Sequence, residues 1–299
     1  MSGAGRASPG RGGEPPSALV TGASRGIGRA IAERLAAAGF ALTLSGRHRE
    51  PLDEVARAAA GAAAGTGVVL ADMAADDDVH RLAHHHAQRF GSLDLLVLCA
   101  GFGTSGPIAE YPIRRFDRQV EVNLRAPFLL IQDCLPSLRR AAVLHPERGA
   151  RIAAITSLTG VASEPGLAAY GAAKAALISV CQSVNVEESA SGVSATAISP
   201  GYVDTEMSSW VRDRIDPADM IEAGDIAELV LALTRLPARA SVPGIVVARR
   251  GGTQWPISLL LHAGLAVRPG QRGVVAGHAG VMCRSEPELW RAPRSRLGP

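Results

Sequence analysis

The stretch Thr21-Gly22-Ala23-Ser24-Arg25-Gly26-Ile27-Gly28 decides the fold, because it stands between two different apolar patterns. Before it, Ala18–Val20 is a short apolar run of the kind that forms a buried strand. After it, Gly26–Ala38 repeats apolar side chains at helical spacing. Glycines at such a turn let the backbone approach a pyrophosphate, and the helix presents free N–H groups to the anion. The stretch therefore predicts a phosphate-binding turn at the start of a dinucleotide-binding unit.

Short apolar runs and helical patterns continue to alternate as far as Ala248. This alternation is typical of a parallel sheet with helices on both faces, wound outward in both directions from the first strand. The sequence thus predicts an α/β fold, a doubly wound parallel sheet of the Rossmann type, in a single domain. The further expected strands are Ala41–Leu44, Val68–Ala71, Leu93–Cys99, Arg151–Thr156, Val193–Ile198 and Gly244–Ala248, and the further expected helices are Leu52–Ala60, Asp77–Phe90, Arg115–Arg140 with a new turn or kink at Pro127, Ala168–Ser189 and Asp225–Arg235.

Both ends of the chain depart from this pattern. Residues 1–16 are rich in glycine, serine, proline and arginine, which predicts a disordered segment. Beyond Trp255 the alternation stops, and residues 256–299 fit a loosely attached tail or a packing arm equally well. The predicted organisation is one domain, residues 17–255, with two flanking segments.

Composition excludes several functional classes. The net charge is only +3 over 299 residues, and no basic run with interleaved aromatics indicates a nucleic-acid partner. The longest apolar runs are too short to cross a bilayer, so we expect no membrane partner. Scattered cysteines without a Cys-x-x-Cys pair favour reduced, mostly buried thiols, a cytoplasmic location and no metal site; they are Cys99, Cys134, Cys181 and Cys283.

Two further clusters invite a metal-site interpretation. Consecutive residues on a helix do not face one another, so we interpret His84-His85-His86 as a solvated helix face. Asp76-Asp77-Asp78 is more typical of a helix N-terminus, where carboxylates complement the helix dipole, than of a cation site.

Lysine occurs once, at Lys174, and all the other cations among the 31 lysines and arginines are arginine. Lysine alone offers a compact ammonium on a flexible stem, so this position is expected to need one. Tyr170 stands four residues earlier, and residues at that spacing share one face of a helix. A phenol and an ammonium held together there form an acid–base unit.

The cofactor's 2′ position is expected at the end of the second strand. NAD-specific sites place a carboxylate there, but none follows this strand before Glu50. Arg47, together with Arg25 from the glycine turn, can instead clamp a 2′-phosphate by charge-assisted hydrogen bonds. The pattern therefore favours NADP(H) over NAD(H). Asp72, after the third strand, fits either an acceptor for the adenine amino group or a helix cap.

The glycine turn, Tyr170 and Lys174 together resemble the short-chain dehydrogenase/reductase family in its compact single-domain branch, over about residues 17–255. Ser157 precedes Tyr170 by thirteen residues (170 − 157), as the family pattern requires. Asn123 is similar to the family's helix asparagine. Pro200-Gly201-Tyr202-Val203-Asp204-Thr205 resembles the loop that holds the nicotinamide amide.

This resemblance implies hydride transfer between a nicotinamide and a small-molecule carbonyl or alcohol. Tyr170 would be the acid/base, with its pKa brought near 7 in part by Lys174, which would also bind the ribose hydroxyls. Ser157 would hold the substrate oxygen, and Asn123 would bind a water that passes protons between Lys174 and solvent. The residues expected to bind the cofactor are Gly22, Ser24, Arg25, Gly26, Ile27, Gly28, Arg47, Asp72, Met73, Cys99, Ala100, Gly101, Tyr170, Lys174, Pro200, Gly201, Val203 and Thr205.

Two departures from the family stand out. Cys99-Ala100-Gly101 replaces the usual Asn-Ala-Gly, which questions local rigidity more than chemistry. Ala248-Arg249-Arg250-Gly251-Gly252 is basic where the family usually has an acidic residue. Asp204–Ala223 is expected to cover an apolar or aromatic substrate as a mobile lid. By the same resemblance we expect a homodimer or homotetramer formed through the helices at Arg115–Arg140 and Ala168–Ser189.

Two other functional classes are weighed against an active reductase. A catalytically silent NAD(P)-binding regulatory or scaffold protein would not need the acid, so the presence of Ser157, Tyr170 and Lys174 speaks against it. An epimerase or dehydratase generally has a different glycine turn and a larger C-terminal substrate domain, and residues 256–299 do not predict one.

Overall fold

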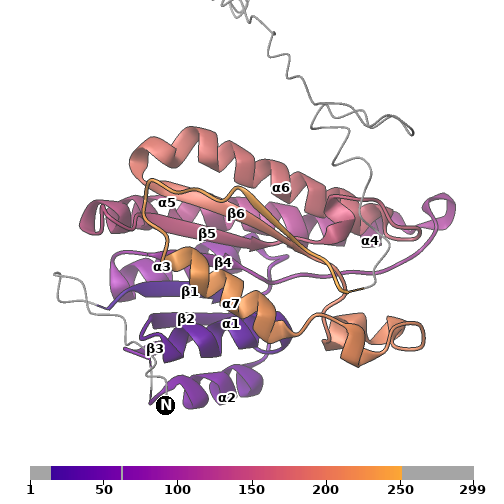
Figure 1. The fold of residues 1–299 in the computed structure, drawn as a ribbon, viewed down its shortest axis with the longest axis horizontal. Coiled ribbons are helices and arrows are strands. Elements are labelled where there is room, and N and C mark those ends of the chain that lie inside the picture. The colour runs from indigo at the N-terminus through magenta and orange to yellow at the C-terminus, as the bar shows by residue number, and fades with distance from the viewer. Residues whose placement is uncertain (1–14, 62, 251–299) are drawn as a thin grey trace, which may run out of the picture. The chain divides into compact units, whose positions relative to one another are not determined.

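The computed structural model describes residues 15–61 and 63–250. Within them, parallel strands form one sheet in the order β3-β2-β1-β4-β5-β6-β7 (Figure 1). The chain first winds from β1 toward β3 and then returns to β4 on the other side of β1, which confirms the doubly wound prediction. The strands are β1 Ser17–Thr21, β2 Ala41–Gly46, β3 Thr66–Leu70, β4 Leu95–Leu98, β5 Ala150–Ile155, β6 Val193–Pro200 and β7 Gly244–Val247.

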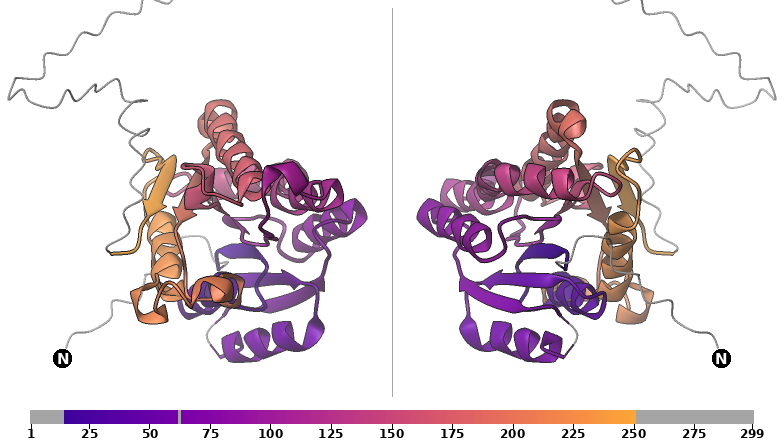
Figure 2. Two further views of the ribbon diagram at one scale, coloured as in Figure 1. Left: turned by 90° about the vertical axis from the view of Figure 1, so that its right-hand side faces the viewer. Right: turned by 90° about the vertical axis from the view of Figure 1, so that its left-hand side faces the viewer.

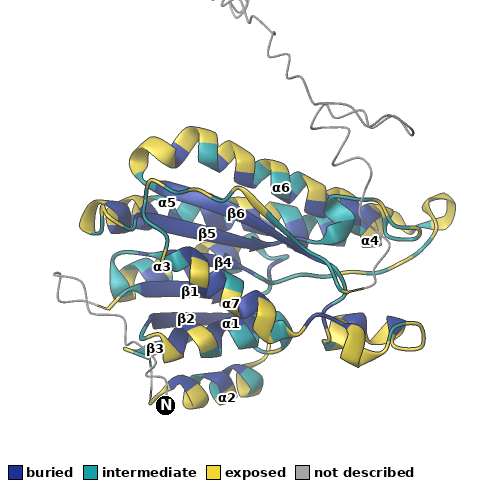
Figure 3. Ribbon diagram, in the orientation of Figure 1, coloured by how far each residue is buried: buried dark blue, intermediate teal, exposed yellow. Residues whose placement is uncertain are grey.

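Helices pack on both faces of the sheet (Figure 2). One face carries α1, α2 and α7, and the other carries α3, α5 and α6. The inner strands are buried while the outer sides of the helices face solvent (Figure 3), so each helix contributes an apolar stripe to one of two cores. The helices are α1 Gly26–Ala37, α2 Arg49–Ala59, α3 Asp76–Phe90, α4 Ile113–Val120, α5 Ala126–Leu144, α6 Ala168–Glu188 and α7 Ala223–Thr234.

The helix expected over Arg115–Arg140 is divided. A π-turn, η2 (Glu121–Arg125), separates α4 from α5, and Pro127 lies in the first turn of α5. Proline has no N–H for the carbonyl four residues earlier, here that of Asn123, and its ring would clash with that carbonyl in a regular helix. The wider π-turn accommodates this constraint, so the expected irregularity begins one turn before the proline itself.

The solvated-face interpretation of the histidine run is wrong for one of its three members. His86 is only 1% exposed, whereas His84 is exposed. The His86 ring lies within hydrogen-bonding distance of the Thr43 hydroxyl (2.8 Å) and of the Ser92 carbonyl (3.2 Å). It shares its helix face with the apolar residues that α3 buries against the sheet, so the three neighbours point in different directions as expected, and one of them points inward.

The structure also bears on the predictions for the cysteines, the acidic run and the apolar segments. Cys134 and Cys181 are buried, Cys99 is partly buried, and Cys283 lies outside the described residues. The acidic run Asp76-Asp77-Asp78 forms the first turn of α3, as predicted. Among the described residues, each helix is too short or too polar to cross a bilayer. The predictions for residues 1–14 and 256–299 fall outside the described residues.

Buried His86 is expected to make stability depend on pH. Desolvation lowers the pKa of His86 to about 4, from 6.5 in an unfolded chain. The unfolded state therefore takes up the proton first, and stability is lost as pH falls from 6.5 toward 4. Chemical denaturation of the wild type at pH 7.5 and pH 5 should show about 2 kcal/mol more loss than the same pair of measurements on His86→Gln. An equal loss in the two proteins would contradict this account.

Candidate functional site

A cavity of about 840 Å³ lies at the carboxyl ends of the strands, where the strand order reverses beside β1. Such a switch point is where open α/β sheets bind ligands. The structure brings nearly all of the predicted site residues onto its wall, and Asn123 is the exception. The predicted residues on the wall are Gly22, Ser24, Arg25, Gly26, Ile27, Gly28, Arg47, Asp72, Met73, Cys99, Ala100, Gly101, Ser157, Tyr170, Lys174, Pro200, Gly201, Val203 and Thr205.

The glycine turn fits closely against its own backbone. A Cβ on Gly28 would lie 2.1 Å from the carbonyl oxygen of Gly22, and one on Gly22 would lie 2.9 Å from the Ala100 backbone. Gly22 also has a φ of +66°, which side chains disfavour. No side chain caps the first turn of α1 within the described residues, so its N–H groups can receive an anion. These features fit the pyrophosphate of a dinucleotide.

Thr21, which sequence reasoning did not select, ties the turn to the strand beside it. Its hydroxyl donates to the Val97 carbonyl (3.1 Å) and accepts from the N–H groups of Cys99 (2.9 Å) and Ala100 (3.1 Å). These bonds hold the segment after β4 without any contribution from the side chain at position 99. Thr21 therefore holds this segment in place even though cysteine replaces the usual asparagine at position 99.

Asp72 lies on the cavity wall after β3 and is held by groups of two kinds. Its Oδ1 accepts from the N–H of Ala74 (3.0 Å), and both its oxygens accept from Nη2 of Arg118 (3.1 and 2.9 Å). Burial alone would raise the pKa of Asp72, but these hydrogen bonds outweigh that effect and hold the pKa below its ordinary value. The helix-cap interpretation is wrong, because the N-cap of α3 is Ala75 and Asp72 instead accepts from Ala74 in the turn before the helix, while the adenine-amino interpretation stays a prediction. Arg118 was missed because nothing in its helical spacing marks it.

The two arginines expected to clamp a 2′-phosphate differ in their surroundings. Arg47 is exposed on the cavity wall directly after β2. Arg25 pairs with Glu206, the first residue of the 3₁₀ turn η5 (Glu206–Val211) in the lid segment. Both partners of this pair are largely exposed, so the contact is weak and leaves Arg25 accessible to a ligand.

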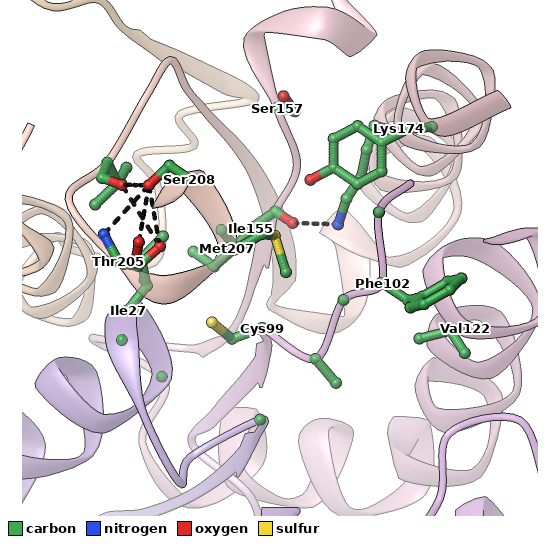
Figure 4. Close-up of a pocket in the computed structure, with 18 of the residues that line it drawn as sticks. Ile27, Cys99, Phe102, Val122, Ile155, Ser157, Lys174, Thr205, Met207 and Ser208 are labelled. Carbon is green, nitrogen blue, oxygen red and sulfur yellow. Dashed lines mark hydrogen bonds between the residues drawn. The ribbon is translucent and has the colours of Figure 1, made fainter. Parts of the chain in front are cut away.

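Tyr170 and Lys174 lie on α6 and meet at the cavity, as their spacing predicts. Lys174 is buried, and its Nζ lies 5.7 Å from the centre of the Tyr170 ring. The ammonium donates a hydrogen bond of 2.9 Å to the Ile155 carbonyl at the end of β5 (Figure 4). Desolvation lowers the pKa of Lys174 to about 8.

The direction of the tyrosine pKa differs from the expectation. Burial raises the pKa of Tyr170 to about 12, and the Ser157 hydroxyl opposes this only in part. In the protein alone, removal from water therefore outweighs any stabilisation of the phenolate by Lys174. At neutral pH the phenol keeps its proton and is a donor.

Ser157 follows β5 by two residues, lies on the cavity wall and caps the 3₁₀ turn η3 (Leu158–Gly160). Its Oγ accepts from the Thr159 N–H (3.2 Å) and the Thr159 hydroxyl (2.9 Å), which leaves the Ser157 proton available to another acceptor. A Cβ on Gly171 would lie 2.8 Å from the Thr159 carbonyl, so the turn packs directly against α6. This packing holds Ser157 beside Tyr170.

Asn123 is completely buried in the π-turn and does not reach the cavity wall. Its amide oxygen accepts from the Phe102 N–H (3.2 Å), and its amide nitrogen donates to the Phe102 carbonyl (2.6 Å) and the Gln119 carbonyl (3.0 Å). The side chain therefore positions the backbone after β4. The water relay assigned to Asn123 stays a prediction.

The segment expected to form a lid, Asp204–Ala223, contains both core side chains and side chains that line the cavity. Val211 and Met220 are buried in the fold, whereas Met207 and Trp210 lie on the cavity wall, 52% and 48% exposed. Sequence reasoning therefore grouped core and cavity residues together in Asp204–Ala223. It also missed several side chains that line the same end of the cavity: Phe102, Leu158, Glu164, Leu167 and Tyr202.

Comparison with known proteins identifies relatives over most of the chain. A family model described as short chain dehydrogenase matches residues 16–216. An uncharacterized oxidoreductase of Staphylococcus epidermidis is 32% identical over 230 residues, which are 77% of this chain and 95% of that protein.

Solved structures with the same fold include two complexes. One is an alcohol dehydrogenase from the archaeon Thermococcus sibiricus complexed with 5-hydroxy-NADP, with a TM-score of 0.71 at 27% identity over 79% of this chain and 97% of its own. The other is a metagenomic short-chain oxidoreductase in complex with NADP, with a TM-score of 0.66 at 29% identity over 78% and 96% of the two chains. Because the family model matches more than half of the chain and a relative is 32% identical over 77% of it, the chain belongs to the short-chain dehydrogenase/reductase family and is an oxidoreductase.

Proposed function

We propose that this oxidoreductase uses NADP(H) to transfer a hydride between the nicotinamide and a carbonyl or secondary alcohol, with Tyr170 as acid/base. The observation that carries the proposal is the placing of Ser157, Tyr170 and Lys174 on the wall of the same cavity as the glycine turn. Two solved relatives in complexes with NADP or its derivative support the cofactor part of the proposal.

The dinucleotide, when bound, supplies or accepts the hydride. Tyr170 donates its proton to the oxygen of the substrate carbonyl during reduction and takes it back during oxidation. Ser157 donates a hydrogen bond to the same oxygen and fixes its position. Lys174, directed by the Ile155 carbonyl, provides a cation that stabilises the phenolate left after proton transfer.

Removal of the phenol hydroxyl should separate chemistry from binding. We expect Tyr170→Phe to lower kcat for reduction at least about a hundredfold, because a general acid contributes that much or more. Its affinity for NADPH, measured by nicotinamide fluorescence, should stay within about threefold of the wild type, since a lost neutral hydrogen bond costs little. Ser183→Ala is the matched control, because it removes an exposed hydroxyl from the same helix at a position off the cavity wall.

Full activity of Tyr170→Phe on the best ketone would contradict the proposed acid. NADPH binding by the wild type without turnover of any carbonyl compound would favour a silent nucleotide-binding protein instead.

Oxidation should depend on pH across the neutral range, whereas reduction should not. Reduction needs the protonated phenol, which a pKa of Tyr170 raised to about 12 supplies throughout the neutral range. Alcohol oxidation needs the phenolate, so its kcat should rise as pH increases from 6 to 8, by up to about tenfold per unit while the phenol remains mostly protonated. Rates measured in both directions across this range test the assignment, and oxidation that is flat with pH would contradict it.

The cofactor preference should depend on Arg47. We expect the wild type to bind NADPH more tightly than NADH. Arg47→Ala should lower the ratio of the NADH to the NADPH dissociation constant by about tenfold or more, because a charge-assisted hydrogen bond to the 2′-phosphate is lost. Arg49→Ala is the matched control, since Arg49 is off the cavity wall and near Asp53 (3.6 Å). Equal binding of NADPH and NADH by the wild type would refute the preference.

We also propose a homodimer or homotetramer formed through α5 and α6. These helices expose large apolar side chains, among them Phe128 (52%), Val143 (78%) and Val186 (84%). Exposed apolar side chains gathered on helices are a feature of association surfaces. The cytoplasmic location stays a prediction.

A further inference from the structure

The substrate end of the cavity contains a carboxylate that the proposed chemistry does not use. Glu164 lies on the cavity wall, in the segment that joins Ser157 to α6. Its Oε1 accepts a hydrogen bond from the hydroxyl of Tyr202, which follows β6 and also lines the cavity. A phenol has one proton to give, so Oε2 of Glu164 remains an acceptor.

Glu164 differs from the other carboxylates of the cavity wall in its charge environment. Asp72 pairs with Arg118, Asp204 pairs with Arg212, and Glu206 pairs with Arg25. Among the residues that the structure describes, Glu164 has no ion pair. A partly buried carboxylate that lacks a cation is poorly compensated for its lost hydration, so a donor from a ligand would be stabilised there.

The one other arginine on the wall that requires comparison is Arg115. It lies on α4, one turn before Arg118, which is held by Asp72. Arg115 forms no ion pair with Glu164 in the part of the chain that the structure describes. Arg214 and Arg249 lie near enough to Tyr202 to oppose the rise of its pKa, but within the described part of the chain neither forms an ion pair with Glu164.

Apolar and aromatic groups surround this carboxylate. The Tyr202 ring meets the Trp210 ring edge to face, with 6.1 Å between their centres, and the Arg214 guanidinium lies 5.2 Å from the centre of the Trp210 ring. Leu158 and Leu167 complete this part of the wall. A carboxylate placed among aromatic and aliphatic wall residues is the kind of polar group that fixes a ligand's orientation.

We propose that Glu164 binds a hydrogen-bond donor on the substrate, a hydroxyl or a protonated amine, at the end of the molecule remote from the reacting carbonyl. This inference rests on the proposed function, since it names the substrate class of the same site. Tyr202 is a positioning residue that directs the Glu164 carboxylate. A substrate with a carboxylate at that end is disfavoured by like charge.

Four ketones of equal length that end in methyl, hydroxyl, ammonium or carboxylate test the inference with the full chain and NADPH. We expect kcat/KM for the hydroxyl and ammonium ketones to exceed that of the methyl ketone by about tenfold or more, with the carboxylate ketone lowest. Glu164→Gln should bring kcat/KM for the ammonium ketone close to kcat/KM for the methyl ketone. Glu187→Gln, which removes an exposed carboxylate from α6, should keep it.

Tyr202→Phe separates positioning from contact. It should raise KM for the hydroxyl and ammonium ketones several-fold more than for the methyl ketone, with little change in kcat, because the carboxylate stays present but less directed. An effect on kcat alone would assign Tyr202 to another role.

Calorimetric titration of the four ketones into the protein, with and without NADPH, makes the result independent of turnover. Tighter binding of the ammonium ketone by the wild type than by Glu164→Gln supports the inference even if no ketone is reduced, in which case only the proposed function fails. Equal binding and equal kcat/KM across the four ketones, or an unchanged order in Glu164→Gln, would overturn it.

Discussion

The site depends on one hydroxyl that joins two strands which are distant in sequence. Thr21 ends β1, and its Oγ donates to β4 while accepting from the first two N–H groups after β4. Those strands are neighbours at the place where the sheet reverses its winding, and their backbone pairing runs from Ala18 and Leu95 to Val20 and Val97. Three hydrogen bonds to the Thr21 side chain extend this connection beyond the paired residues to the segment on the cavity wall. The glycine turn on one side and the segment with Cys99 on the other then approach to backbone contact.

Burial decides the protonation states that the chemistry needs. Taking a phenol and an ammonium out of water favours the neutral form of each, so the pKa of Tyr170 rises while that of Lys174 falls. The protein alone therefore holds a proton donor rather than a phenolate. A positive charge brought by an oxidised nicotinamide would act against this effect, which makes the ionisation of Tyr170 depend on what occupies the cavity.

The sequence predicted the elements whose signals are local. The glycine turn, the spacing of Tyr170 and Lys174, and the alternation of strands and helices each depend on residues close together in the chain, and the fold confirms all three. His86, Arg118 and Glu164 were missed or misread because their partners come from other elements: Thr43 in β2, Asp72 after β3 and Tyr202 after β6. The irregular turn η2 was predicted only in part. Pro127 indicated that the long helix would be interrupted, but it did not show that the interruption begins one turn earlier.

Gly26 has a consequence for the lid as well as for the phosphate turn. A Cβ at this position would lie 3.1 Å from Cγ2 of Thr205, the residue that caps the first turn of the lid segment. Its backbone also has a φ of +53°, which disfavours any side chain. The phosphate turn and the lid segment therefore pack directly against each other at Gly26. A larger residue there would perturb both the affinity for the nucleotide and the enclosure of the substrate. Kinetic losses at this position cannot be apportioned to the nucleotide alone.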